Sequence, residues 1–304
     1  MFTRVRLGPK HSKLTNRDTA ILISGFGRFG NMVIQVWNAA LAAKKLGIER
    51  VLYWNNPRLT SREIQLIPGV LLTRATSMRI EDTAPPTHLI RTRAFSVARA
   101  PDGFSFQEIS SLRNSLSAEI FADRFPATNL GTEALVIHLR SGDVFWNEPH
   151  RDYGQPPFAF YELVVKSKKW EKIILVSEDQ ENPCFALITD LCDRLNLQIE
   201  VTGRSLDEAL DAIANASALV MSRGTFVASI LWLVPAARHI FTFGLDNLPP
   251  FPIENTSITQ VIDAEGRYES EVLNGNWRNN RDQRALMVSY PMSSLRVLDN
   301  ASAH

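Results

Sequence analysis

The stretch EALVIHLRSGD at residues 133–143 decides the class of fold. Its first seven residues, EALVIHL, form a short and mostly apolar run, which is typical of a strand buried on both faces of a sheet. Four similar stretches follow it along the chain, and segments whose apolar residues recur with a helical period lie between them. We expect strands at 133–139, 172–177, 197–201, 218–221 and 238–243, and helices at 158–167, 182–195, 206–214 and 225–233. This alternation predicts an α/β unit whose parallel sheet carries helices on both faces.

The first half of the chain opens with the same alternation. Residues 19–24 (TAILIS) predict a buried strand, residues 30–46 a helix that Gly47 ends, and residues 51–54 a second strand. Residues 56–130 are broken by prolines, and residues 246–304 are polar with little apolar period. A chain of 304 residues suits about two domains.

Composition excludes several classes of protein. An apolar fraction of 45% and a charged fraction of 21% are ordinary for a globular chain, which excludes disorder and collagen-like sequence. The longest apolar stretches fall well short of the roughly 20 residues that a membrane span needs. No apolar core follows the basic N-terminal residues, so we expect a cytoplasmic protein. The two cysteines, Cys184 and Cys192, predict buried free thiols in a reducing compartment.

The net charge of +1 conceals an asymmetry along the chain. Residues 1–100 hold 16 Lys and Arg against 5 Asp and Glu, whereas the rest hold 17 against 27. Such a basic block attracts phosphate, an anionic glycan or a membrane surface, although a scattered solvated basic face explains it as well. No basic helix with interleaved aromatics is present. We therefore expect no nucleic-acid partner and at most a weak membrane-surface contact through the basic third.

The first chemical signal is GFGRFG at residues 25–30, a G-x-G-x-x-G between a predicted strand and a predicted helix. Glycines permit the tight turn, and the helix N-terminus offers free N–H groups to an anion. A dinucleotide site also needs an acid at the end of the second strand. That strand ends YWNN at residues 53–56, and Glu49 precedes it. An NAD-linked dehydrogenase using Gly25, Gly27 and Gly30 is one alternative, and a turn needed only for packing is another.

The second signal is HLRSGD at residues 138–143, directly at the carboxyl end of a predicted strand. Ligands of open α/β sheets bind in the crevice beyond these ends. The fork of Arg140 suits a phosphate, and Gly142 would let a ligand approach the backbone closely. A structural ion pair between Arg140 and Asp143, beside a hydrogen-bonded His138, is the alternative.

Two further signals also follow predicted strands. Residues 177–179 (SED) offer carboxylates to a ribose or a base, or they mark a helix start whose dipole they complement. Residues 221–226 (MSRGTF) combine hydroxyls, a glycine and a helix N-terminus, which are the ingredients of a phosphate nest. An N-cap hydroxyl is the simpler explanation of the second segment.

Taken together, the four segments resemble the GDP-fucosyltransferase superfamily, which includes α-1,2-, α-1,6- and protein O-fucosyltransferases. Residues 27–31 (GRFGN) are similar to its N-terminal signature, and residues 138–143 to its H-x-R-x-G-D motif. Residues 177–179 stand where the family has an S-D-D-like segment. Residues 221–226, followed by LWL at 231–233, resemble its S-x-S-F motif. Order and spacing agree across residues 19–245.

The resemblance implies a GT-B architecture, in which two Rossmann-like domains face each other across a cleft. Residues 1–130 would form the acceptor-side domain, residues 131–245 the nucleotide-sugar domain, and residues 246–304 a tail that could return to the first domain. It also implies inverting, metal-independent transfer of fucose or a related sugar from a GDP-sugar to a glycan acceptor, with no cofactor. The chain has no D-x-D run of the kind that holds Mg²⁺ against a diphosphate.

The resemblance also suggests roles for individual residues. Arg140 would neutralise the departing GDP, Asp143 would act as the base, and Asn31 would face the donor sugar or the acceptor oxygen. The remaining candidates for donor binding are Gly27, Arg28, Gly30, His138, Gly142, Glu178, Asp179, Ser222, Arg223, Gly224 and Thr225. Besides the dehydrogenase, a non-catalytic glycan-binding protein on a transferase fold remains an alternative.

Overall fold

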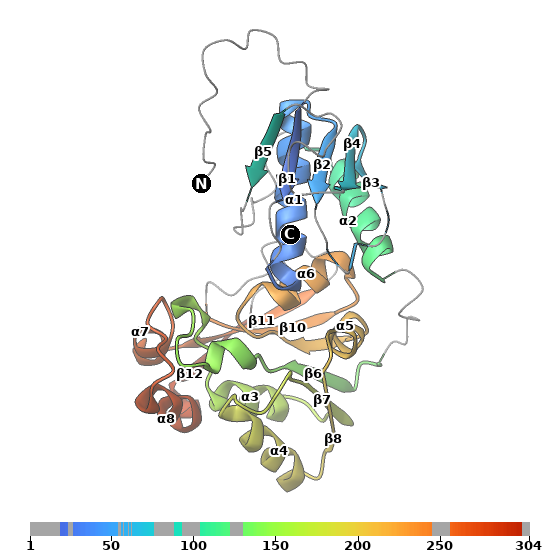
Figure 1. The fold of residues 1–304 in the computed structure, drawn as a ribbon. Coiled ribbons are helices and arrows are strands. Elements are labelled where there is room, and N and C mark those ends of the chain that lie inside the picture. Colours follow the sequence, from blue (N-terminus) through green and yellow to red (C-terminus); the bar gives the residue numbers. More distant parts are fainter. Residues whose placement is uncertain are drawn as a thin grey trace. The chain divides into compact units, whose positions relative to one another are not determined.

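The protein is described by a computed structural model of its 304 residues. It describes residues 19–23, 27–53, 56, 58–59, 61, 63–75, 88–92, 104–121, 130–244 and 256–299. The chain divides into two compact units, residues 1–125 and residues 126–304. Each unit has its own largely parallel sheet with helices packed on it (Figure 1). The predicted α/β class is confirmed.

The first unit has a five-stranded sheet with the order β3-β4-β2-β1-β5. Its strands are β1 (Thr19–Ile23), β2 (Arg50–Tyr53), β3 (Glu63–Ile67), β4 (Val70–Arg74) and β5 (His88–Thr92). All neighbours are parallel except β3, which runs antiparallel to β4. Helix α1 (Phe29–Leu46) packs against β1, β2 and β4, and α2 (Phe106–Phe121) packs against β3. The strand–helix–strand start predicted from the sequence is confirmed.

Gly47 ends helix α1, as the sequence predicted. Its φ of 67° is left-handed, and its backbone N–H donates to the carbonyl of Lys44 at 3.2 Å. Glycine reaches this conformation without a steric penalty, so it stops the helix at little cost. Lys44 and Lys45 in the last turn complement the negative end of the helix dipole. The helix is therefore closed by local sequence alone.

The second unit has a seven-stranded sheet with the order β12-β11-β10-β9-β6-β7-β8. Its strands are β6 (Ala134–His138), β7 (Lys172–Val176), β8 (Gln198–Thr202), β9 (Ala218–Val220), β10 (His239–Phe243), β11 (Ser257–Asp263) and β12 (Leu295–Asp299). Only β12 is antiparallel to its neighbour among these described strands. Numbered along the chain, the six parallel strands follow the 3-2-1-4-5-6 order of dinucleotide-binding folds.

Four helices cover the two faces of this sheet. They are α3 (Phe158–Lys166), α4 (Cys184–Arg194), α5 (Leu206–Ala214) and α6 (Thr225–Leu233). Helices α3 and α4 pack together on one face, while α5 and α6 pack together on the other (Figure 1). All five strands and all four helices predicted here are present, with ends shifted by at most two residues. Cys184 and Cys192 lie buried on α4 as free thiols, as predicted.

The structure contains elements that the sequence did not reveal. Within residues 56–130 it forms β3, β4, β5 and α2, and within residues 246–304 it forms β11, α7 (Arg267–Val272), α8 (Arg281–Ser289) and β12. Strand β11 reads SITQVID, so polar residues interrupt its apolar pattern although its last four residues are buried. Residues 256–299 extend the sheet and the helical layer of the second unit.

Candidate functional site

Three of the four sequence signals meet at one edge of the second sheet. The strand register places His138 of β6 opposite Val176 of β7, and Ile137 opposite Val220 of β9. The residues that follow these strands, 139–143, 177–179 and 221–224, therefore share the carboxyl edge around β6, which we call the switch-point edge. There the chain turns from β6 toward β7 on one side and from β9 toward β10 on the other. Such a point is where open α/β sheets hold ligands.

Arg140 lies at the switch-point edge, in the loop that follows β6. Its guanidinium carbon lies 4.3 Å from the centre of the Tyr153 ring, and Nη2 lies 3.5 Å from Asp143 Oδ1. Asn182 Nδ2 donates to the Arg140 carbonyl at 2.9 Å. Because the Arg140 side chain is only 12% exposed, water screens its charge weakly, so an anion there would be attracted more strongly than at the open surface. The ion pair with Asp143, which the sequence offered as the structural alternative, is present.

His138 is the last residue of β6, and its side chain is buried. Its Nδ1 lies 2.5 Å from Ser222 Oγ, and its ring centre lies 5.3 Å from that of Phe226. Burial, together with the charge of Arg140, lowers the pKa of His138 to about 3, so the imidazole is neutral at pH 7. The pair ties the end of β6 to the end of β9. A bond from His138 to a diphosphate or ribose stays a prediction.

Two glycines allow side chains of this site to pack directly on the backbone. Gly224 has φ 133° and ψ −178°, and a Cβ there would overlap Nη1 of Arg140. Gly142 has φ 66°, and a Cβ there would overlap the Glu178 carboxylate. The sequence predicted that Gly142 admits a ligand to the backbone. In the structure the chain's own Glu178 occupies that place.

The loop after β7 is held to the loop after β6 by hydrogen bonds. Asp179 Oδ1 accepts from the Ser141 hydroxyl, from the N–H of Glu181 at 2.9 Å and from the N–H of Gly142 at 3.4 Å. Ser177 Oγ donates to Leu139 O at 3.0 Å. Asp179 therefore orders its own loop through Oδ1. A hydrogen bond from a guanosine to Asp179 would have to use the acceptor positions that these bonds do not occupy.

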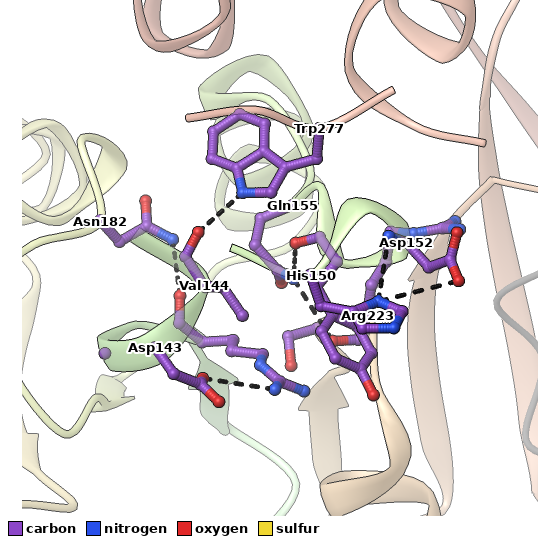
Figure 2. A network of polar contacts seen from close by, with 12 residues as sticks. Asp143, Val144, His150, Asp152, Gln155, Asn182, Arg223 and Trp277 are labelled. Carbon is purple, nitrogen blue, oxygen red and sulfur yellow. Dashed lines mark hydrogen bonds and ion pairs between the residues drawn. The ribbon is translucent and has the colours of Figure 1, made fainter. Parts of the chain in front are cut away.

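The simpler explanations of two segments are wrong. Residues 177–179 do not complement a helix dipole, because α4 starts at Cys184 and has no acidic residue in its first turn. Ser222 does not cap α6, because the N-cap is Gly224 and no side chain caps that helix. Thr225 instead opens α6, while Arg223 is buried and its carbonyl accepts from Gln155 Nε2 at 3.4 Å (Figure 2).

The remaining candidates lie in the first unit, at the start of α1. Arg28 is the N-cap residue without a side-chain cap, and the first turn carries no acidic residue. A Cβ on Gly27 would lie 2.8 Å from Asn31 Nδ2, so the two residues are close neighbours at the start of the helix. Gly30 is buried within the first turn, and Asn31 is half-buried. Gly25 and Phe26 of the G-x-G-x-x-G lie outside the described residues, as do Arg79, Arg93 and Arg99 of the basic block.

Several residues that shape the site were not predicted from the sequence. Tyr153, which stacks on Arg140, lies in the irregular loop 139–157, where no periodicity marks it. Asn182 precedes a proline at a helix start, so its local role was foreseeable: Oδ1 accepts from the N–H of Cys184 at 2.9 Å. Its second bond, to Arg140, is set by tertiary structure. Phe226 packs on His138 from within α6.

In the described part of the chain, no three His, Cys, Asp or Glu side chains are grouped as ligands for a metal ion. None of the described helices combines the length and the apolar character that crossing a membrane requires.

Comparison with known proteins finds no matching family model and no matching curated protein. Among solved structures, the chain is similar to the heptosyltransferase WaaC of E. coli with ADP, at 13% identity and a TM-score of 0.38, over 85% of this chain and 95% of that one. It is similar to E. coli ADP-heptose LPS heptosyltransferase II, at 14% identity and a TM-score of 0.29, over 79% and 67%. It is also similar to sucrose-phosphate synthase of Thermosynechococcus elongatus, at 12% identity and a TM-score of 0.33, over 90% and 95%. At this level of similarity the comparisons identify neither substrate nor site.

Proposed function

We propose that the chain is an inverting glycosyltransferase that moves fucose, or a related sugar, from a GDP-sugar to a glycan acceptor without a metal ion. The observation that carries the proposal is the guanidinium of Arg140, held between Tyr153 and Gly224 at the switch-point edge. A nucleotide-diphosphate sugar suits this edge because its pyrophosphate needs a desolvated cation and its nucleoside needs the crevice of a Rossmann-like sheet.

The proposed reaction is a single displacement. The acceptor hydroxyl oxygen attacks the anomeric carbon, the bond from that carbon to the phosphate oxygen breaks, and GDP leaves with the electron pair. Arg140 would stabilise the negative charge that develops on the leaving diphosphate, which is commonly worth about 3–4 kcal/mol for one donor. Asp143, whose side chain is 34% exposed, would accept the proton of the acceptor hydroxyl.

The first test is a thermal-shift panel of GDP, UDP, ADP, CMP and NAD on the full chain. A ligand that binds only the folded state, at 100 times its dissociation constant, adds about 2.7 kcal/mol of stability. We expect GDP to give the largest shift. Stabilisation by NAD(H) alone would favour a dehydrogenase, and glycan binding without donor turnover would favour a non-catalytic protein.

The second test replaces the arginine. Arg140→Ala should lower transfer from GDP-fucose by roughly 10²–10³-fold, because the charge on GDP is left unpaired. Arg140→Lys should recover only part of the rate, since an ammonium lacks the planar fork. Arg267→Ala is the control, because Arg267 pairs with Glu271 on the exposed surface of α7. A folded Arg140→Ala protein with near-normal turnover would overturn the assignment.

A further inference from the structure

The loop 139–157, which leaves the switch-point edge, carries an exposed indole, that of Trp146. The short 3-10 helix η3 (Gly142–Phe145) begins two residues after Arg140, and its Val144 and Phe145 side chains lie in the core. The next residue, Trp146, is 63% exposed. Among the large apolar side chains that the structure describes as exposed, the aromatic ones are Trp146 and Phe106, and Phe106 lies in the first unit. Trp146 is thus an exposed aromatic three residues from Asp143.

The backbone beneath Trp146 is fixed by side chains from the segment between α7 and α8. Trp277 Nε1 donates to Val144 O at 2.7 Å (Figure 2), and its ring meets that of Phe145 edge-on at 5.6 Å. Asn279 Nδ2 lies 2.6 Å from the carbonyl of Phe145 and 3.1 Å from that of Trp146. The backbone that carries the indole is therefore already ordered. A ligand that stacks on Trp146 would lose little affinity to the ordering of the chain.

Polar groups follow Trp146 on the same loop. His150 Nδ1 accepts a hydrogen bond from the backbone N–H of Asp152 at 3.3 Å. In the neutral ring the proton is therefore on Nε2, so the Nε2–H group can donate a hydrogen bond to a ligand. The His150 and Asp152 side chains are 63% and 70% exposed. The His150 ring lies 4.8 Å from that of Tyr153, which in turn carries the Arg140 guanidinium. These two contacts connect the exposed loop to the candidate catalytic arginine.

We propose that residues 146–152 form the acceptor subsite, where one pyranose ring of the glycan stacks on Trp146 and its hydroxyls bond to His150 and Asp152. The inference rests on the proposed function and names a surface that receives the acceptor. It places this contact in the second unit, whereas the family resemblance implied that residues 1–130 form the acceptor side. A pyranose has an apolar C–H face, which matches an exposed indole, and a rim of hydroxyls, which exposed polar side chains of the same loop can bind.

The test separates donor from acceptor. Trp146→Ala and Trp146→Phe are compared with wild type, and Phe106→Ala is the control for loss of an exposed aromatic. Each protein is assayed for GDP binding by calorimetry, for GDP-fucose hydrolysis without acceptor, and for transfer to methyl β-galactoside, methyl N-acetyl-β-glucosaminide and methyl α-mannoside. Trp146→Ala should raise KM for the used acceptor about tenfold or more, with kcat little changed, because it removes a stacking anchor. Trp146→Phe should recover most of that affinity, and Phe106→Ala should match wild type.

The outcomes are distinguishable. An unchanged acceptor KM in Trp146→Ala would overturn the acceptor subsite while leaving the proposed function intact. Loss of GDP binding or of donor hydrolysis in that variant would also overturn it, because Trp146 would then serve the donor or the fold. A wild-type chain that neither binds GDP nor hydrolyses the donor would refute the proposed function. Titration of the three glycosides would then decide the subsite: binding that Trp146→Ala abolishes supports it, and no binding to wild type overturns it.

Discussion

Replacing Gly224 by alanine should disturb the fold and the candidate site together. Gly224 adopts φ 133° and ψ −178°, a conformation that is almost exclusive to glycine, so an alanine there stores about 1–3 kcal/mol of backbone strain. Its Cβ would also overlap Nη1 of Arg140, forcing the guanidinium away from Tyr153. The cation–π contact that is lost is worth about 0.5–2 kcal/mol. We therefore expect a total loss of about 1.5–5 kcal/mol.

The matched control is Gly266→Ala at the start of α7. Gly266 has φ 73° and ψ 0°, and nothing lies within 4 Å of a Cβ there, so only the left-handed penalty of about 1–2 kcal/mol applies. Thermal unfolding measures both variants, at about 2–4 °C per kcal/mol for a unit of this size. Calorimetry then compares GDP affinity, which Gly224→Ala should weaken and Gly266→Ala should leave unchanged. Equal destabilisation and equal affinity in the two variants would refute the packing of Arg140 on Gly224.

Two further predictions concern the core and its pH dependence. Tyr161 and Tyr268 are both fully buried. The Tyr161 hydroxyl has no hydrogen-bond partner among the residues that the structure describes, whereas the Tyr268 hydroxyl donates to Gln155 O at 2.7 Å. Urea unfolding should therefore show Tyr161→Phe to be neutral or stabilising and Tyr268→Phe to cost about 0.5–1.5 kcal/mol, and the reverse order would contradict this assignment. Because the pKa of His138 falls from 6.5 in the unfolded chain to about 3 in the fold, the unfolded state binds more protons between these values, so stability falls as the pH is lowered through that window. His138→Gln should remove up to about 1.4 kcal/mol per pH unit of that slope, and a slope equal to that of wild type would show that His138 is not the group responsible.

Sequence alone determined the elements whose local signals are strong. The strands β6, β7 and β10 are short apolar runs, and α1 ends at a glycine that needs a left-handed backbone, so composition and period locate them. The positions of HLRSGD, SED and MSRGTF after strands also follow from the sequence, because a parallel sheet gathers its carboxyl ends at one edge.

Tertiary structure alone decided which side chains meet at that edge. Tyr153 packs on Arg140, and Glu178 packs on Gly142. Trp277 and Asn279 bond to the backbone of residues 144–146, and these contacts join segments up to 134 residues apart. No local pattern encodes such contacts, because their free energy comes from packing and hydrogen bonds that form only when the sheet is assembled. The same reason hid β11, whose buried polar residues Gln260 and Asp263 bond to Gly244, Glu269 and Tyr290 only in the folded chain.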